Sequence, residues 1–306
     1  MRRKLYTAAG KSGEVRLAIP FVLPMVRLMQ TPPLLTDRPA LDRNRARALL
    51  APAFFLHEEA IFEVQERLNE VNRTFTAPAV VTPFANIWRK VMSNARIVAD
   101  TDVLDLQVDA HDLVIHAVGM HWANDPVGQL VQCRRALKPD GLFLGLLFGG
   151  QTLSQLRTCL AEAEVSIAGG LSPRVLPMAE IRDLGGLLQR AGFALPVADS
   201  FTRTVRYRDA FHLMADLRSM GEGNALYQRQ RRPTKRKVFT AAAKIYQSVF
   251  AGADGLIPAT FEMICLTGWA PDDSQQKPLR PGTATHRLSD HLGADEKPLP
   301  SEPGGS

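Results

Sequence analysis

The sequence is poor in cysteine and in aromatic residues, and it has no long apolar run. Its three cysteines, Cys133, Cys159 and Cys265, are too few and too scattered for a disulfide framework or a zinc site. No stretch approaches the ~18 uninterrupted apolar residues of a membrane-spanning helix. We therefore expect a protein of a reducing, cytoplasmic compartment, without an integral membrane segment.

The net charge of +6 is unevenly spread along the chain. Residues 1–30 hold six Lys or Arg and one Glu, so the rest of the chain is nearly neutral. A neutral body argues against a general nucleic-acid-binding protein. A second basic run, residues 228–237, holds six Lys or Arg and no acid. Because no aromatic residues lie between its charges, it is typical of a solvated entrance to a helix, and an RNA or lipid patch is the alternative.

The two ends of the chain differ from its middle. Residues 1–33 are basic and then apolar, with interruptions at Pro20 and Pro24. Three interpretations stay open for them: a segment upstream of a true start at Met29, a targeting segment that makes peripheral membrane contact, or a packed N-terminal element. Residues 272–306 are rich in Pro, Gly and Ser, which predicts a mostly disordered tail. The predicted domain therefore spans residues 34–271.

Runs of apolar residues predict strands that alternate with helices. The clearest unit is an apolar strand over 112–118, a helix from Pro126, a turn at 138–141 and a second apolar strand over 142–148. Strands that are apolar on every residue belong to a parallel sheet covered on both faces. We therefore predict an α/β fold with a doubly wound, mostly parallel sheet. Further helices are expected at 58–69, 85–92, 153–166, 177–190, 210–220 and 238–250, and further strands at 79–81, 96–100, 203–207 and 260–269.

Common catalytic motifs are absent from the sequence. It has no G-x-S-x-G, H-E-x-x-H or G-x-G-x-x-G pattern, and Gly10-Lys11-Ser12 matches only the end of a phosphate-binding loop. His111, His116 and His121 are spaced by five, which suits neither one face of a helix nor one face of a strand. No metal site is therefore expected.

Candidate ligand-binding residues follow the predicted strands, because open parallel sheets bind ligands beyond the carboxyl ends of their strands. Asp100 and Thr101 end one strand, residues 116–122 end the next, and Gly149 ends a third. Asp100 could accept a hydrogen bond from an adenine amine or a ribose hydroxyl, or it could cap a helix. Trp122 could line a substrate pocket, or it could be a core aromatic.

Several runs of residues match a known family. The first set is Asp112-Leu113-Val114-Ile115, His121-Trp122, Asp125-Pro126 and Leu137-Lys138-Pro139-Asp140-Gly141. With these runs the chain resembles the type 11 class I methyltransferases, which use S-adenosylmethionine (SAM). Residues 148–153, 169–173 and 183–193 narrow the resemblance to the group of the mitochondrial complex I assembly factor 5 and its alphaproteobacterial relatives. The likeness covers residues 34–285.

This resemblance implies a methyltransferase-type sheet, a SAM cofactor and a protein partner such as a respiratory-complex subunit. The mitochondrial member is described as hydroxylating an arginine of a complex I subunit, so methyl transfer and arginine hydroxylation are the two activities implied. By this resemblance Asp100 lies near the adenine and His116 near the methionine end of the cofactor, and Thr101, which follows Asp100 at the strand end, is the third predicted cofactor residue. By their place after the strands, His121, Trp122 and Gly149 are the predicted substrate or partner pocket.

One stretch departs from the family pattern. Methyltransferases carry an acidic, glycine-rich D-x-G-x-G turn after the first strand, whereas residues 79–85 contain no glycine and no acid. Pro83 also removes a backbone donor there. Only about 16 residues separate Val81 from Ile97, about half of what two crossovers need. We therefore expect the sheet to lack one strand and one helix, together with the ribose-binding acid of the second strand.

Three functions stay open at this point. The first is a SAM-dependent enzyme of the methyltransferase family that acts in complex I assembly. The second is a noncatalytic binding or assembly module, which the degenerate cofactor site favours. The third is membrane-surface or nucleic-acid binding through residues 1–30 and 229–237, although specific recognition of nucleic acid is not expected.

Overall fold

A computed structural model describes residues 33–276 of the chain. The chain divides into two units, Met1–Pro33 and Leu34–Ser306, and the described helices and strands belong to the second. The predicted N-terminal extension, apart from Pro33, and the predicted tail beyond residue 276 lie outside the described residues. Within the described part, no helix combines the length and the apolar character needed to cross a membrane.

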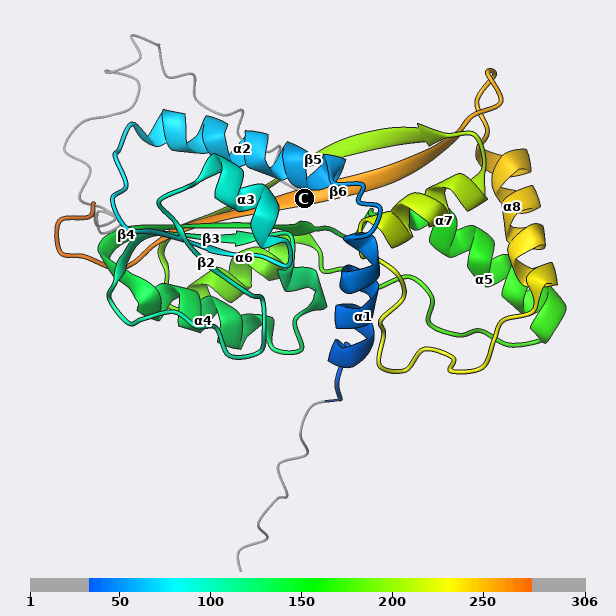
Figure 1. The fold of residues 1–306 in the computed structure, drawn as a ribbon, viewed down its shortest axis with the longest axis horizontal. Coiled ribbons are helices and arrows are strands. Elements are labelled where there is room, and N and C mark those ends of the chain that lie inside the picture. Colours follow the sequence, from blue (N-terminus) through cyan, green and yellow to red (C-terminus); the bar gives the residue numbers. More distant parts are fainter. Residues whose placement is uncertain (1–32, 277–306) are drawn as a thin grey trace, which may run out of the picture. The chain divides into compact units, whose positions relative to one another are not determined.

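The described part is built on one six-stranded sheet, which confirms the predicted α/β class (Figure 1). The strand order is β2-β1-β3-β4-β6-β5. The first four strands in this order run parallel, and β6 lies antiparallel to both β4 and β5. The strands are β1 (Pro78–Val81), β2 (Arg96–Val98), β3 (His111–Ala117), β4 (Leu137–Phe148), β5 (Ala194–Tyr207) and β6 (Ile257–Trp269).

Helices cover both faces of the sheet, with α2 and α3 on one face and α4 and α6 on the other (Figure 1). The apolar strand β3 shows why: Leu113 and Ile115 belong to one buried cluster, while Val114 belongs to the cluster on the opposite face. Alternate side chains of a strand point to opposite faces, so both faces need a cover. The helices are α1 (Arg38–Ala48), α2 (Phe55–Val71), α3 (Ala85–Val91), α4 (Pro126–Ala136), α5 (Ser154–Ala168), α6 (Ile181–Arg190), α7 (Ala210–Ser219) and α8 (Arg236–Phe250), with a short 3₁₀ helix, η1 (Met120–Trp122).

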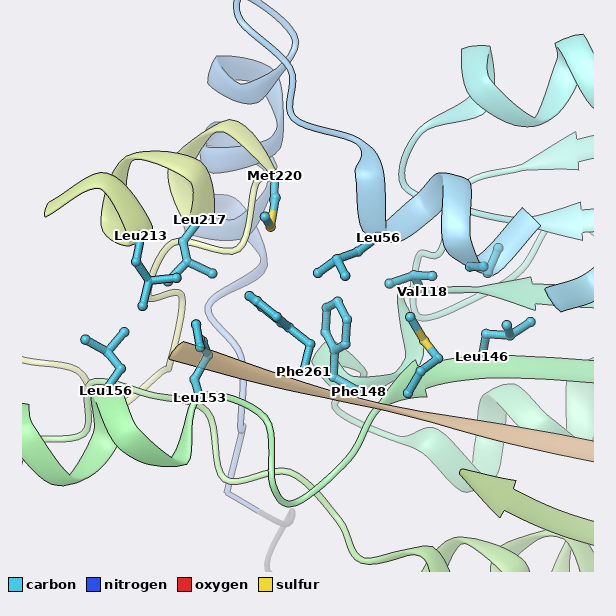
Figure 2. Close-up of a cluster of buried hydrophobic side chains, with 14 of the residues drawn as sticks. Leu56, Val118, Leu146, Phe148, Leu153, Leu156, Leu213, Leu217, Met220 and Phe261 are labelled. Atoms are coloured by element: carbon cyan, nitrogen blue, oxygen red, sulfur yellow. The ribbon is translucent and has the colours of Figure 1, made fainter. Parts of the chain in front are cut away.

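The larger cluster also packs α7 against α5 and the ends of β4 and β6. Figure 2 shows Leu213 and Leu217 of α7 on one side of this cluster and Leu156 of α5 on the other, with Phe148 and Phe261 nearby. Burying five large side chains of this kind contributes roughly 1.5–3 kcal/mol each before entropic costs. This packing fixes α5 and α7 beyond the carboxyl end of β4.

The short passage from β1 to β2 contains one helix, α3, as its length predicts. Strand β2 pairs directly with β1, with Val80 opposite Ile97. The prediction of a buried strand over 96–100 is wrong in detail, because β2 has three residues and Arg96 is exposed. The reason is its position: β2 forms an edge of the sheet and has one neighbour.

Several other boundaries differ from prediction. Strand β5 begins at Ala194 rather than at 203, and α6 begins at Ile181 rather than at 177. The turn expected at 138–141 is the first part of β4. Helix α1 was not predicted, because its buried residues include an arginine, Arg45, so that it shows no clear apolar stripe.

Candidate functional site

A buried ion pair lies at the carboxyl edge of the sheet. Asp100 follows β2 and is 3% exposed, and Arg45 of α1 is 7% exposed. The guanidinium of Arg45 donates from Nη1 and Nη2 to the two carboxylate oxygens of Asp100, at 2.8 and 2.9 Å. Arg38, also on α1, donates to the backbone oxygen of Asp100 at 2.8 Å. Both carboxylate oxygens of this predicted cofactor residue therefore already face a cation of the chain itself.

Gln129 connects the other two predicted cofactor residues, Thr101 and His116. Its Nε2 donates to the backbone oxygen of Thr101 at 3.0 Å, so its Oε1 faces Nε2 of His116 at 2.9 Å. His116 must therefore carry its proton on Nε2. Its Nδ1 is buried without a partner among the described residues. Burial lowers the pKa of His116 to about 4, so the ring is neutral.

The structure thus brings Asp100, Thr101 and His116 to one edge of the sheet. His57 of α2 joins them and lies close enough to Arg45 and Asp100 for their charges to affect its protonation. Burial lowers the pKa of His57 to about 4. Its Nδ1 also has no partner among the described residues.

A cavity of about 230 Å³ lies beside this edge, beyond the ends of β4 and β6. Most of its wall is apolar, and α5, α7, α8 and the loops that follow α5 and α7 contribute to it. Its lining residues are Trp122, Phe148, Thr152, Leu153, Leu156, Leu160, Arg174, Val175, Leu176, Met178, Met214, Leu217, Arg218, Glu222, Gly223, Asn224, Phe239 and Phe261.

Glu222 is the carboxylate in this wall, and its side chain is 10% exposed. Its Oε2 accepts hydrogen bonds from Nε1 of Trp122 at 2.7 Å and from Nε2 of His121 at 3.2 Å. Burial by itself raises the pKa of Glu222, but His121, Arg45 and Trp122 together lower it below its ordinary value. The carboxylate is therefore ionised at neutral pH.

The cavity wall also contains two arginines. Nη2 of Arg174 lies 2.5 Å from Oε1 of the buried Glu164. The guanidinium carbon of Arg174 lies over the ring of Phe239, 5.7 Å from its centroid. Its charge is therefore balanced. Arg218 is exposed at the rim. Among the described lining residues, Glu222 is thus the buried charge that no Lys or Arg pairs with directly.

The three predicted pocket residues separate in the structure. Trp122 lines the cavity, and His121 lies behind it with a side chain that is 1% exposed. Gly149 is not among the lining residues. Its backbone N–H donates to the carbonyl of Glu262 at 2.8 Å, and a Cβ there would lie 2.7 Å from Cδ1 of Ile264. Gly149 therefore allows the end of β4 to pack against β6.

Sequence reasoning missed Arg45, His57 and Glu222. Arg45 lies in an arginine-rich segment whose neighbours Arg43 and Arg47 are exposed, so nothing in the sequence separates it from them. Glu222 follows Gly221, and this glycine is the sequence signal that could have found it: Gly221 has a φ of +80° and places the next residue in a fixed turn.

Two arginines of the second basic run, residues 228–237, form salt bridges with the residue that caps α1. Arg229 and Arg231 pair with Asp37 at 2.9 and 2.8 Å, and Asp37 caps α1 by accepting from the N–H of Ala40. The end of the run is the start of α8 at Arg236, as the solvated-entrance interpretation predicts.

The described residues do not fit SAM in the way that the resemblance implies. Arg45 already binds both carboxylate oxygens of Asp100 and balances its charge, so this acid is not the free ribose or adenine ligand that the resemblance implies. The turn after β1 is closed, since Thr82 accepts from the N–H of Phe84, and Phe84 is 3% exposed and packs against His57. Within residues 33–276 there is also no group of three or more His, Cys, Asp or Glu arranged to hold a metal ion.

Comparisons with known proteins show which family the chain belongs to. No protein-family profile matches the chain. Over 246 residues it is 36% identical to the mitochondrial arginine-hydroxylase NDUFAF5 of Homo sapiens, covering 80% of this chain and 68% of that protein. It is 43% identical over 183 residues to the NDUFAF5 of Dictyostelium discoideum, covering 60% of this chain and 42% of that one. A protein of Rickettsia prowazekii named as a methyltransferase is 32% identical over 157 residues, with 51% and 69% of the two chains covered.

Among solved structures, a Bacillus halodurans protein named as a methyltransferase aligns with a TM-score of 0.43 and 14% identity, over 65% of this chain and 93% of that one. The chain spans 60%, 42% and 62% of the NDUFAF5 proteins of Danio rerio, Dictyostelium discoideum and Mus musculus. From the human and Rickettsia identities, the chain belongs to the NDUFAF5 family of methyltransferase-related proteins.

Proposed function

We propose that this protein binds an arginine side chain of a protein partner in the cavity, with Glu222 as the residue that receives the guanidinium. The partner would be a subunit of a respiratory complex under assembly. The observation that carries this proposal is the state of the Glu222 carboxylate. Its Oε2 accepts two hydrogen bonds, whereas its Oε1 accepts none from the described residues.

This oxygen is not among the buried side-chain atoms that lack a partner, so it faces the open space of the cavity. A cationic ligand in the cavity would pair with it. Arginine suits the cavity better than lysine does, because its planar fork donates to carboxylates in two parallel bonds. Its three methylene groups would lie along the apolar wall formed by residues such as Leu217 and Met178.

The relatives support the ligand class. Several are named arginine-hydroxylases, and the chain is 36–43% identical to them. Since this chain spans only part of the first of these proteins, their activity is not transferred as a whole. Recognition of arginine is the part that the cavity supports.

A titration of two matched peptides tests this function. Each peptide has a Gly/Ser backbone and one central residue, arginine in the first and citrulline in the second, which has the same shape without the charge. We expect calorimetry to show at least about tenfold tighter binding of the arginine peptide, because citrulline leaves Glu222 unpaired.

Glu222→Gln should abolish this preference, and Glu66→Gln, an exposed acid on α2, should leave it intact. Equal affinities of the wild-type protein for the two peptides would rule out the proposed function.

A second candidate is a SAM-dependent enzyme. One observation favours it: Nδ1 of His57, of His116 and of His121 are all buried without partners in the described part of the chain. Buried unsatisfied groups often mark the place of a missing ligand or water molecule. Saturable binding of SAM or S-adenosylhomocysteine in the micromolar range would support this candidate.

A further inference from the structure

Helix α1 connects the sheet edge to the loop that carries Glu222. At one end of this connection, Arg45 binds Asp100 through two hydrogen bonds. Two further residues bind the loop after α7. Asn44 donates to the carbonyl of Gly223 at 3.0 Å, and the N–H of Asp37, which caps α1, donates to the carbonyl of Ala225 at 2.8 Å. The same helix therefore contacts both the predicted cofactor acid and the cavity wall.

The contact between Arg45 and the loop is close. Gly221, which directly precedes Glu222, has a φ of +80°, and a Cβ on it would lie 3.1 Å from Cγ of Arg45. Only a glycine lets the loop approach the arginine side chain this closely without strain. The position of Arg45 thus limits where Glu222 can lie.

We propose that Asp100 is a positioning residue: it holds Arg45 in place, and Arg45 in turn sets the position and the charge of Glu222 in the cavity. The edge that would receive a nucleoside in a SAM enzyme supports the cavity carboxylate instead. The role of Glu222 in ligand binding rests on the proposed function, whereas the contacts of Arg45 with Asp100 and Gly221 do not depend on it.

Two further observations support the assignment. A Cβ on Gly119 would lie 2.6 Å from Oδ2 of Asp100, so the backbone of Gly119 packs closely against this carboxylate. Charged and titratable groups reach Glu222 from three elements, namely His121 of η1, Arg45 of α1 and His57 of α2. Because burial keeps His57 neutral at pH 7, Arg45 is the permanent positive charge among them.

The first test is a titration of the full chain with SAM and with S-adenosylhomocysteine. We expect no saturable heat and no thermal shift up to millimolar ligand, because Arg45 already binds both oxygens of Asp100 and the backbone of Gly119 packs against Oδ2. Micromolar binding that Asp100→Asn abolishes would overturn the proposal.

The second test is a thermal double-mutant cycle on Arg45→Met and Asp100→Asn. Each single substitution leaves a buried partner without compensation, so each should lower Tm by several degrees, and the double substitution should lower it by less than the sum. Asp102→Asn, an exposed acid in the same loop, is the matched control and should leave Tm unchanged. Additive effects would contradict the assignment.

The third test separates positioning from stability. The carboxyl carbon of Glu222, assigned by its loss in Glu222→Gln, is followed by ¹³C NMR over pH. Arg45→Met should raise the apparent pKa of Glu222 by about one unit, a tenfold change in proton affinity, and Arg45→Lys should restore most of it. If Arg45→Met does not fold, Arg45→Lys is compared with wild type, and the lost fork geometry should broaden or shift the Glu222 signal.

An unchanged apparent pKa of Glu222 in folded Arg45→Met would overturn the positioning role, and so would an unchanged Glu222 signal in Arg45→Lys where Arg45→Met does not fold. None of these measurements uses an arginine ligand. If the arginine peptide fails to bind while the three tests give the expected results, the ligand of the cavity is wrong and the positioning role stands.

Discussion

The indole N–H of Trp122 donates to Glu222 at 2.7 Å, joining two residues that lie 100 positions apart in the chain. One comes from η1 at the end of β3, and the other from the loop after α7. This bond fixes a charged group in the cavity wall to the sheet. Hydrogen bonds to ionised groups are worth about 1.5–3 kcal/mol, so it is also a measurable part of the stability.

Trp122→Phe should therefore destabilise the protein by more than the packing loss alone. The matched control is Trp88→Phe, because Trp88 is equally buried but its Nε1 has no partner among the described residues. We expect the free energy of unfolding in urea to fall by about 2 kcal/mol more for Trp122→Phe than for Trp88→Phe. Equal losses would mean that the bond to Glu222 adds nothing to stability.

The stability should depend on pH between about 6.5 and 4. The pKa values of His57 and His116 are lowered by burial from 6.5 to about 4. In this range the unfolded chain binds protons that the folded chain does not, so the free energy of unfolding must fall as the pH falls. Each histidine contributes about 3 kcal/mol to this loss.

His57→Phe should weaken that dependence. Phenylalanine keeps the edge-on contacts that His57 makes with Phe54 and Phe84, but it cannot bind a proton. Urea unfolding at pH 7, 5.5 and 4.5 would show a smaller decrease for the variant than for wild type. Parallel curves would indicate that His57 takes up its proton equally well in both states.

Gly149→Ala should lower stability through a steric clash rather than through loss of ligand binding. The added methyl group would lie 2.7 to 2.8 Å from side-chain atoms of Ile264 and Glu262, and overpacking of this kind costs about 1–3 kcal/mol. Gly170→Ala is the control, since no atom lies within 4 Å of its Cβ position. The measurement is Tm together with peptide affinity, and a selective loss of affinity at unchanged Tm would assign Gly149 to the binding site.

Much of the fold could be predicted from the sequence because its signals are local. The apolar strands β3 and β4 and the periodic helices α2 and α8 each carry their own pattern within a few residues. The shortened passage between β1 and β2 follows from chain length alone.

The candidate site could not be predicted in the same way. Its central contacts join Arg45 to Asp100 and Trp122 to Glu222, pairs that are 55 and 100 residues apart. Nothing in a single sequence distinguishes Arg45 from the exposed arginines beside it. Gly149 was assigned to the pocket for its place after a strand, but the lack of a side chain there allows β4 to pack closely against Glu262 and Ile264 of β6.

The shortness of β2 has a consequence for association between chains. An edge strand such as β2 exposes unpaired N–H and C=O groups, and a strand of another chain can pair with them. Here the exposed edge is three residues long, and Arg96 at its start is paired with Asp105. The opposite edge, β5, is longer but carries the charged residues Arg203 and Arg206. Both ends of the sheet are therefore protected against aggregation, one by brevity and the other by charge.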